Sequence, residues 1–325
     1  MGPTIALGGD IMLGRGVAET LAERPPTDVW SPELRAVFAE ADMAVVNLEC
    51  CISERGEPWD PEEKAFHFRA PPRAVEALTA IGVRAVWLAN NHALDFGREA
   101  LADTLDHLAD AGIVVIGAGR NLEEARVGRI IEIAGMRIGL VAFADHPDDF
   151  AATPQSSGIA WADIAGGTPP WLVDEVRRLS EACDIVIAGP HWGPNMTSAP
   201  SHRHRAVAGD LVAAGLGALA GHSAHVVHGI ELRGGTPICY DLGDLVDDYM
   251  VDPVLRNDFG MLALLRPGER LELVPLRLTF AHTTLAHGSD HAAIVERVIR
   301  ASRVLGTDLR LEGDRLVLDL RDKAG

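Results

Sequence analysis

Six short segments of this chain place an acidic, amide or imidazole side chain at the end of a predicted β-strand, and most of them follow an apolar run. Short apolar runs of this kind are typical of buried strands. In open α/β sheets, ligands bind just beyond the carboxyl ends of the strands, so polar residues at several strand ends converge on one site. The six segments are 9–10, 47–49, 90–95, 190–193, 221–225 and 241–244.

Strand and helix signals alternate as far as residue 250, which predicts an α/β fold. Strands are expected at 4–9, 43–48, 83–89, 113–116, 129–133, 137–144, 184–188, 217–220, 225–232 and 237–240, and helices at 32–41, 72–82, 97–111, 170–182 and 203–214. Antiparallel strands at 259–266 and 270–280, a helix at 289–304 and a hairpin at 308–320 are expected to follow. We expect a catalytic core of residues 1–250 that residues 251–325 complete within the same domain. Two long loops, 52–66 and 145–170, are candidate lids.

The chain is strongly acidic, with a formal net charge of -18 at pH 7. Phosphate contacts need clustered Lys and Arg, so this charge disfavours nucleic acid and anionic membranes as partners. No early segment resembles a signal peptide, and no apolar run reaches the roughly 18 residues of a membrane span. The four cysteines lie in or beside apolar runs, which suits reduced thiols. We therefore expect a cytoplasmic protein without membrane contact.

The first two segments supply oxygen ligands. Asp10 follows Gly8 and Gly9, which let the backbone approach a ligand closely and leave the carboxylate at a turn. Alternatively, Asp10 caps the segment that follows. Glu49 ends an apolar strand two residues after Asn47, so both side chains lie on one face of that strand. A carboxylate beside an amide predicts a site for a hard cation.

Segment 90–95 carries the most specific pattern. Asn91 offers a carbonyl oxygen, and His92 offers a proton carrier or a metal ligand. Asp95 can hydrogen-bond to His92, fix its tautomer and stabilise its imidazolium form. The alternative is an Asn/Asp turn that caps the helix expected at 97–111, which leaves His92 without a role.

Three further imidazoles follow the later strands. His191 comes after a buried strand and precedes Trp192, an aromatic wall for a bound ligand, although a lone histidine there can also be a core residue. His222 and His225 lie three residues apart in a glycine-bounded turn, and this spacing suits a metal or a proton relay. Asp244 adds a carboxylate after the last strand of the alternating region.

Several of these segments form a recognisable series of motifs, at 9–15, 46–49, 68–70, 88–95, 191–193 and 224–231. In this order they resemble the CapA family of capsule synthesis, a branch of the calcineurin-like metallo-dependent phosphatases. The resemblance runs from about residue 5 to residue 247. It implies two packed β-sheets flanked by helices, with the site at the strand ends.

The resemblance also implies roles for individual residues. Glu49 stands in the place of the phosphatases' bridging carboxylate, and Asn91 in the place of their metal-binding amide. His92 stands in the place of the proton donor, and His191 in the place of the histidine of the fourth motif. Two imidazole positions depart from the phosphatase pattern. Met12 stands in the first motif and Ser223 in the fifth, each where the phosphatases have histidine.

The loss of two imidazoles disfavours a pair of transition metals and leaves an oxygen-rich ligand set. We expect one divalent cation, Ca²⁺ or Mg²⁺ by preference and Mn²⁺ or Zn²⁺ otherwise, and no organic cofactor. Its predicted ligands are Asp10, Glu49, Asn91, His191 and Asp244. Other imidazoles are then free for proton transfer, and the predicted catalytic pairs are His92 with Asp95 and His225 with Asp10.

Two imidazoles on opposite sides of a carbon acid can remove a proton from one face and deliver one to the other. Certain CapA-like proteins are peptide epimerases of lasso-peptide pathways, and this chain resembles them in its short length and reduced metal-ligand set. The first hypothesis is therefore epimerisation of the C-terminal residue of a ribosomal precursor peptide. The predicted substrate contacts are Arg15 or Arg69 at the terminal carboxylate, and Trp192 and His222 beside the substrate.

Two alternatives belong to other functional classes. One is metal-dependent hydrolysis of a phosphoester or an amide, as the phosphatase resemblance implies. The other is a polyglutamate-binding protein without turnover, which the net charge of -18 disfavours because like charges repel.

Overall fold

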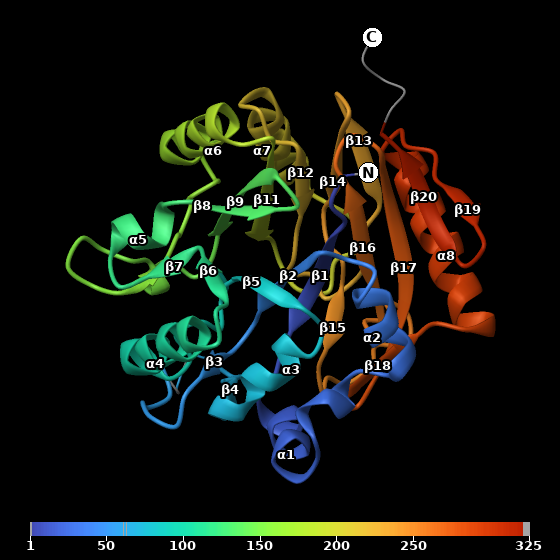
Figure 1. The fold of residues 1–325 in the computed structure, drawn as a ribbon. Helices are drawn as coiled ribbons and strands as arrows, with labels where there is room; N and C mark the ends of the chain where they lie inside the picture. Colours follow the sequence, from blue (N-terminus) through green and yellow to red (C-terminus); the bar gives the residue numbers. More distant parts are fainter. Residues whose placement is uncertain (1, 61, 63, 321–325) are drawn as a thin grey trace.

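The computed structural model describes residues 2–60, 62 and 64–320. Two large β-sheets contribute to one hydrophobic core, and helices flank them (Figure 1). The predicted α/β architecture of two packed sheets flanked by helices is confirmed. None of the helices in the described part of the chain combines the length and the apolar composition that a membrane crossing requires.

The larger sheet joins the beginning and the end of the chain. Its strand order is β19-β20-β17-β16-β1-β2-β5-β6, with β15 paired to β1 and β18 paired to β17. Its bounds are β1 Ile5–Ile11, β2 Met43–Leu48, β5 Val83–Trp87, β6 Val114–Ile116, β15 Asp244–Val246, β16 Phe259–Arg266, β17 Arg270–Thr279, β18 His282–Leu285, β19 Arg310–Glu312 and β20 Arg315–Asp319. Strands β1, β2, β5, β6 and β15 are parallel, whereas β16 is antiparallel to β1.

The tail strands therefore extend the sheet that begins with β1. The division into residues 1–250 and 251–325 stays a prediction. Residue 1 of the first part and residues 321–325 of the second lie outside the described residues.

The second sheet has the order β13-β14-β12-β11-β9-β8. Its bounds are β8 Arg129–Ile133, β9 Met136–Ala144, β11 Ile185–His191, β12 Ala218–Ala220, β13 Ile230–Arg233 and β14 Thr236–Cys239. Strands β9, β11, β12 and β14 are parallel, and the antiparallel strands β8 and β13 form the edges. Parallel strands thus form the interior of this sheet and the β1–β6 half of the larger sheet, the arrangement that gathers loop residues at carboxyl ends.

The helices agree with most of the predicted positions. Their bounds are α1 Arg15–Glu23, α2 Pro32–Phe38, α3 Val75–Thr79, α4 Gly97–Asp110, α5 Leu122–Arg126, α6 Pro170–Ala182, α7 His202–Ala213 and α8 Gly288–Val304, with short 3₁₀ helices at Pro26–Val29, Pro72–Ala74 and Asp148–Phe150. Ser31, Asn121 and Ser201 cap three of them by accepting a backbone N–H with the side-chain oxygen. Helices α1 and α5 were not predicted.

Three predicted segments differ from the structure. The strand expected at 225–232 forms only as β13 from Ile230, and it does not begin at His225, whose φ angle of 57° is left-handed. The loop predicted at 52–66 starts at the end of the short strand β3 Cys51–Ile52, which pairs with β4 Arg69–Ala70, and the loop predicted at 145–170 contains β10 Gly158–Ile159, which pairs with β7 Ala118–Gly119. Within the loop 52–66, residues 61 and 63 lie outside the described residues.

Strand β1 approaches the segment before β15 more closely than a side chain allows. The N–H of Asp10 donates to the carbonyl oxygen of Gly243 over 3.2 Å, and a Cβ atom added at Gly9 would overlap that oxygen. Glycine at position 9 is therefore required for the pairing of β1 with β15.

We predict that Gly9→Ala destabilises the protein strongly, because the added methyl group has only backbone to displace. Overpacking in a core costs about 1–3 kcal/mol, and a backbone clash lies at the upper end of that range. Gly166→Ala is the matched control, since a Cβ atom there meets nothing within 4 Å. Urea unfolding of both variants measures the difference, and equal free energies of unfolding would contradict the prediction.

Candidate metal centre

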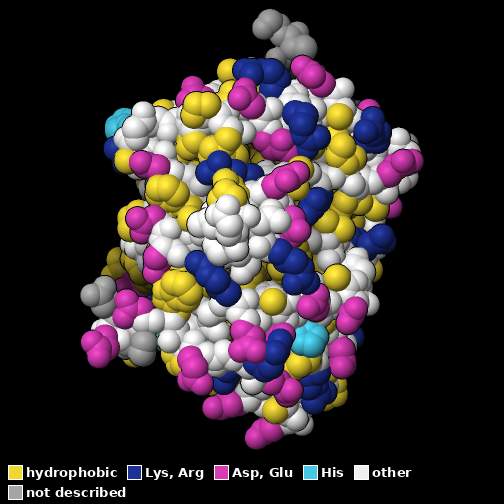
Figure 2. Space-filling view, turned by 90° about the vertical axis from the view of Figure 1, so that its left-hand side faces the viewer, with side chains coloured by type: hydrophobic (Ala, Val, Ile, Leu, Met, Phe, Trp, Pro, Cys, Tyr) yellow, Lys and Arg dark blue, Asp and Glu magenta, His cyan; other side chains and the backbone are white. Residues whose placement is uncertain are grey.

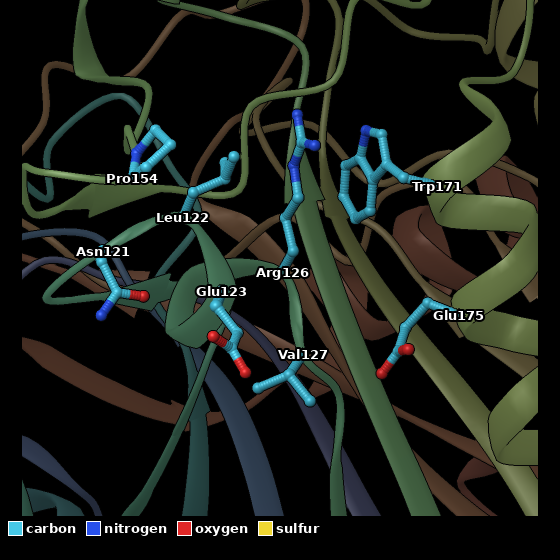
Figure 3. A pocket seen from close by; sticks show the side chains of 8 residues that line it. All are labelled: Asn121, Leu122, Glu123, Arg126, Val127, Pro154, Trp171 and Glu175. Carbon is cyan, nitrogen blue, oxygen red and sulfur yellow. The ribbon is translucent and has the colours of Figure 1, made fainter.

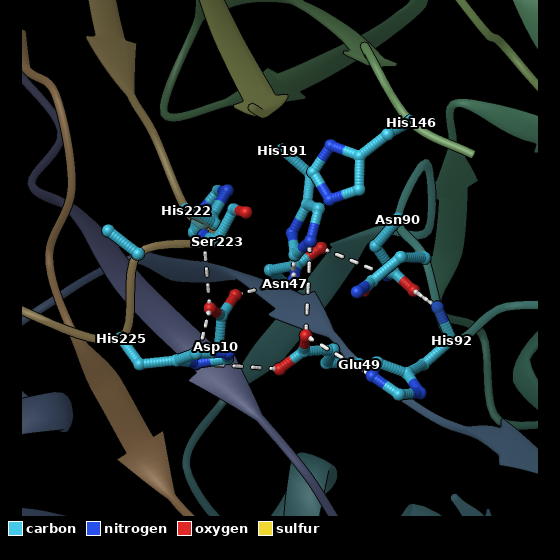
Figure 4. A network of polar contacts seen from close by, with 12 residues as sticks. Asp10, Asn47, Glu49, Asn90, His92, His146, His191, His222, Ser223 and His225 are labelled. Atoms are coloured by element: carbon cyan, nitrogen blue, oxygen red, sulfur yellow. Dashed lines mark hydrogen bonds and ion pairs between the residues drawn. The ribbon is translucent and has the colours of Figure 1, made fainter. Parts of the chain in front are cut away.

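Four buried ligand groups meet at the strand ends of the larger sheet. Asp10 is paired in register with Asp244 of β15, Glu49 follows β2, and His225 lies in the loop after β12. One ligand atom from each residue lies within 4.8 Å of every other (Figure 4 shows three of them). The Nδ1 atom of His225 is 2.8 Å from Asp244 Oδ1, 3.5 Å from Asp10 Oδ2 and 4.0 Å from Glu49 Oε2. The strand register thus assembles three carboxylates around one imidazole.

This cluster lacks the hydrogen bonds that buried carboxylates need. Both carboxylate oxygens of Glu49 and the Oδ2 atom of Asp244 are buried without a hydrogen-bond partner. Leaving such groups unsatisfied costs about 1–3 kcal/mol each, and more when they are charged. A divalent cation removes this cost, and three carboxylates with one imidazole suit Mg²⁺, Ca²⁺, Mn²⁺ or Zn²⁺. The residues present therefore fit a metal ion.

The pKa values reflect the same burial of charged groups without enough partners. Burial raises the pKa of Asp10 to about 7, although His225 opposes the shift, and burial together with the charge of Asp10 raises the pKa of Glu49 well above its usual value. For His225, burial disfavours the imidazolium, but Asp244, Glu49 and Asp10 outweigh it and raise the pKa. The negative charge of the three carboxylates therefore favours a cation at this place, here the protonated form of His225.

Glu49 also faces a second set of imidazoles. Its Oε1 atom is 3.9 Å from the Nε2 atom of His92 and 3.9 Å from the Nε2 atom of His191. The Nε2 atom of His191 is buried without a hydrogen-bond partner, and burial lowers the pKa of this imidazole well below its usual value. His191 is therefore neutral. The side-chain nitrogen of Asn47, a donor, lies 3.4 Å from its Nδ1 atom, which assigns the ring proton to the Nε2 atom that faces Glu49.

Two side-chain amides support the cluster: Asn47 contacts a carboxylate, and Asn90 contacts Asn47. Asn47 donates to Asp10 Oδ1 over 2.6 Å, and Asn90 donates to Asn47 Oδ1 over 3.1 Å and to the carbonyl of Leu48 over 2.7 Å (Figure 4). The Asn90 side-chain oxygen accepts the backbone N–H of His92 over 3.0 Å. Asn90 was not among the predicted site residues, although it belongs to the segment that was singled out.

His92 is oriented as the spacing of segment 90–95 predicts. Its Nδ1 atom is 2.6 Å from Asp95 Oδ2, which also accepts the backbone N–H of Phe68 over 2.6 Å, and Lys64 Nζ lies 2.9 Å from the other Asp95 oxygen. Burial lowers the pKa of His92 to about 4, and this outweighs the effect of Asp95. The partner of Nδ1 assigns the proton to that nitrogen, so Nε2 presents a lone pair toward Glu49.

The other predicted site residues lie in different surroundings. The side-chain oxygen of Asn91 is buried without a hydrogen-bond partner, and its backbone carbonyl accepts from Lys64. Trp192 packs in an apolar cluster and donates to the carbonyl of Tyr240 over 3.1 Å. His222 contacts the carbonyl of Pro190 through Nδ1 at 3.2 Å, and its Nε2 atom has no partner.

The two arginines predicted to bind a carboxylate have different partners. The Arg69 guanidinium lies 4.1 Å from the ring centroid of Phe96, and it donates to the carbonyls of Arg55 and Gly56. Arg15 is paired with Asp248 over 2.9 Å.

Two residues near the centre were missed. Asp145 and His146 directly follow β9, and the ring of His146 lies 5.5 Å from the ring of His191 (Figure 4). The signal that would have found them is the one used elsewhere, a polar pair after an apolar strand.

A cavity of about 520 Å³ lies away from these side chains (Figure 3). It is lined by Asn121, Leu122, Glu123, Arg126, Val127, Pro154, Trp171 and Glu175, so it shares no residue with the centre. The molecular face seen in Figure 2 carries acidic, basic and hydrophobic side chains interspersed, without a field of one charge. The centre at the strand ends is therefore separate from this cavity.

Fold and centre together define an α/β protein whose two mixed sheets present a buried carboxylate–imidazole cluster at their strand ends. The family described as "Bacterial capsule synthesis protein PGA_cap" matches residues 4–249. The chain belongs to this family, which includes the CapA proteins that its motifs resemble.

Two relatives illustrate the similarity. A Mycobacterium tuberculosis protein described as "Probable polyglutamine synthesis accessory protein" is 31% identical over 366 aligned residues, which cover 97% of this chain and 95% of the relative. The "PGA biosynthesis protein CapA" of Bacillus subtilis is 29% identical over 242 residues, which cover 74% of this chain and 62% of the relative.

Among solved structures, a 5'-nucleotidase from Candida albicans has a TM-score of 0.46 at 9% identity, covering 93% of this chain and 58% of that chain. A 5'-nucleotidase precursor from Thermus thermophilus has a TM-score of 0.41 at 13% identity, covering 94% and 59%. These values transfer no activity to the chain.

We predict that a divalent cation raises the melting temperature of the wild-type protein above its value in EDTA, and that Glu49→Gln abolishes this increase. Binding stabilises by about 2.7 kcal/mol at a cation concentration of 100 times Kd. The metal-free variant should be at least as stable as the metal-free wild type, because it loses one of three crowded carboxylates. Thermal unfolding with Mn²⁺, Mg²⁺ and Ca²⁺ measures both effects.

Glu231→Gln is the matched control. Glu231 is also a buried carboxylate, but it accepts from Arg205 and Arg233, each over 2.9 Å. This variant should lose stability and keep the full cation-induced increase. An undiminished increase in the Glu49 variant would rule out the four-residue centre.

Proposed function

We propose that the protein is a divalent-cation-dependent hydrolase that cleaves an amide bond of a glutamyl polymer. The observation that carries the proposal is the position of Glu49, with one oxygen toward the Asp10–Asp244–His225 cluster and the other 3.9 Å from the oriented imidazole of His92. A bound cation supplies Lewis-acid polarisation of the scissile group and lowers the pKa of a bound water. Asp10, Glu49, Asp244 and His225 would hold it.

The chain's own acid–base group in this proposal is His92. Its pKa of about 4 keeps the imidazole neutral at physiological pH, so Nε2 can accept a proton from the attacking water. Asp95 holds Nδ1–H over 2.6 Å and stabilises the imidazolium that forms. The same imidazole then returns the proton to the leaving amine, which restores its neutral form.

The choice of an amide over a phosphoester rests on the relatives. One is described by polyglutamine synthesis and one by PGA biosynthesis, and both terms describe chains of amide-linked residues. A phosphoester remains the alternative substrate for the same centre, and a polymer-binding protein without turnover is the alternative outside enzymology.

We predict that His92→Ala lowers kcat by about 10²- to 10⁴-fold, the usual contribution of a positioned acid–base group, and leaves the bound metal unchanged. His225→Ala should lose both metal and activity. The assay is release of amino groups from a γ-linked glutamate oligomer by the Mn²⁺-loaded protein, with an aryl phosphate tested in parallel and metal content measured by mass spectrometry.

His228→Ala is the control, since this buried histidine contacts the carbonyl of Thr197 over 3.0 Å and does not belong to the centre. It should retain kcat. Binding of the oligomer without turnover by any cation-loaded form would favour the non-catalytic alternative and remove the hydrolase.

A second candidate is epimerisation of a ribosomal precursor peptide. The observation in its favour is that His92 and His225 approach Glu49 from different sides, 3.9 Å from Oε1 and 4.0 Å from Oε2, each with a carboxylate partner. The nearer partner of His225 is Asp244 at 2.8 Å, and Asp10 lies at 3.5 Å. In this reaction both imidazoles exchange protons with one Cα atom, so His225 cannot also be a metal ligand through the same nitrogen.

For this candidate we predict that incubation of precursor peptides in D₂O incorporates one deuteron for each inverted centre. A two-base enzyme lacking one imidazole should still exchange the proton of one enantiomer without inverting it. Mass and chiral analysis of the products of His92→Ala and His225→Ala separates the two reactions. Hydrolysis of the glutamate oligomer without deuterium uptake into any peptide would end the epimerase hypothesis.

A further inference from the structure

We propose that Arg15 forms a carboxylate-recognition subsite at the mouth of the metal centre, and that Asp248 occupies this subsite as an internal counter-anion which a carboxylate of the substrate replaces. This inference rests on the proposed function and names the feature of the substrate that the same site selects. It adds a competing residue of the chain itself, Asp248, to the earlier expectation that Arg15 or Arg69 binds a carboxylate.

The position of Arg15 follows from two aromatic rings. The ring of Phe68 stacks on His92 with centroids 4.0 Å apart, and the ring of Tyr249 meets His225 edge to face at 5.3 Å. The guanidinium carbon of Arg15 lies 5.5 Å from the centroid of Phe68 and 5.8 Å from the centroid of Tyr249. A single ring therefore separates this cation from each of the two imidazoles.

The outer side of the cation is open to solvent. The side chain of Arg15 is 37% exposed, and its guanidinium carbon also lies 5.6 Å from the ring of Phe66, which is 60% exposed. Aromatic rings around a guanidinium hold its plane without using its N–H donors. The donors remain available for an anion that arrives at the mouth.

Asp248 now receives those donors in the geometry that a ligand carboxylate would use. Nη2 of Arg15 is 2.9 Å from Oδ1 of Asp248, and Nε donates to Oδ2 over 3.2 Å. This two-point contact is the preferred arrangement of a guanidinium with any carboxylate. The pair is only partly exposed, since the Arg15 side chain is 37% and the Asp248 side chain 6% exposed, but Asp248 keeps the backbone N–H of Gly16 as a partner when Arg15 turns to another carboxylate.

The backbone places Arg15 there at some cost. Arg15 has a φ angle of 50°, a left-handed conformation that a non-glycine residue rarely adopts. On one side, a Cβ atom at Gly14 would lie 2.9 Å from the backbone nitrogen of Arg69 and 3.0 Å from Cα of Phe68. The close approach of this turn to Phe68 brings the guanidinium over the ring, and strain retained beside a site supports a functional role.

Two other cationic side chains near the site, Lys64 and Arg69, have different partners. Lys64 lies 2.9 Å from Asp95 Oδ1, an oxygen of the carboxylate that orients His92. Arg69 donates to two backbone carbonyls and stacks on Phe96. Arg69 is therefore a matched control, an arginine of the same neighbourhood that also lies on an aromatic ring but has no carboxylate partner among the described residues.

The test compares two fluorescein-labelled peptides in fluorescence anisotropy, a γ-linked pentaglutamate and the same peptide with its α-carboxylates converted to carboxamides. Binding is measured with the Mn²⁺-loaded full chain in a His92→Ala background, so that turnover does not interfere. Arg15→Ala should weaken binding of the carboxylate peptide by about 10- to 100-fold, the equivalent of the roughly 1.5–3 kcal/mol of a charged hydrogen bond. Binding of the carboxamide peptide should not change.

The direction in which Asp248→Asn changes the affinity for the carboxylate peptide is the decisive result. Asparagine keeps an oxygen for the backbone N–H of Gly16, which Asp248 accepts over 2.9 Å, but removes the competing charge. This variant should bind the carboxylate peptide several-fold more tightly, whereas a merely structural Asp248 would give weaker or equal binding. Arg69→Ala should behave as the parent, and an unchanged cation-induced increase in melting temperature shows that each variant is folded.

Equal weakening of both peptides by Arg15→Ala, failure of the parent to bind the carboxylate peptide, or weaker or equal binding by Asp248→Asn would overturn the inference. Hydrolysis of both peptides with equal kcat/KM by the protein that retains His92 would leave the hydrolase standing without the subsite. A carboxylate preference that depends on Arg15, without hydrolysis, would leave the subsite standing without the hydrolase.

Discussion

Strand β1 carries Asp10 to a position between two partners, and the centre depends on that placement. Its register sets Asp10 opposite Asn47 of β2 on one side and opposite Asp244 of β15 on the other. Glycine at position 9 allows β15 to come this close. Because Asp10 and Asp244 leave neighbouring strands at the same level, the hydrogen-bond ladder itself crowds these two carboxylates. Their mutual repulsion is therefore built into the sheet, and a cation is the ligand that relieves it.

Glu49 connects the two halves of the chemistry. One of its oxygens faces the cation cluster and the other faces the neutral imidazoles of His92 and His191. In the proposed hydrolase, a substrate group held by a bound cation on one side would lie beside a proton acceptor on the other. The role of His225 decides which reaction follows, because its Nδ1 atom can coordinate a cation or exchange a proton, but it cannot do both at once.

Much of this arrangement could be predicted from local sequence. Apolar runs that end in polar residues identified the strands and their carboxyl ends, and the three-residue spacing of His92 and Asp95 indicated their contact. The contact of His225 with Asp10 was expected only from the family resemblance, and no local pattern indicates it, since it depends on left-handed backbone at Ser223 and His225, which non-glycine residues rarely adopt. Nor could the sequence place Trp192, because β11 continues to His191 and directs the next side chain into an apolar cluster. The mouth of the site depends on packing between segments 15–16, 66–68 and 248–249, and no local pattern reports such packing.

The net charge of -18 opposes the approach of an acidic polymer at long range, but the relevant distance is short. At physiological ionic strength the Debye length is about 8 Å, so charges on the far surface contribute little at the mouth. What an approaching carboxylate meets there is the guanidinium of Arg15, held by Phe68 and Tyr249 and paired with the largely buried Asp248. Behind it lie the carboxylates of the centre, whose charge a bound cation would neutralise. The acidic surface therefore disfavours non-specific contact with anionic polymers, while the proposed exchange of Asp248 for a substrate carboxylate would admit such a group at Arg15.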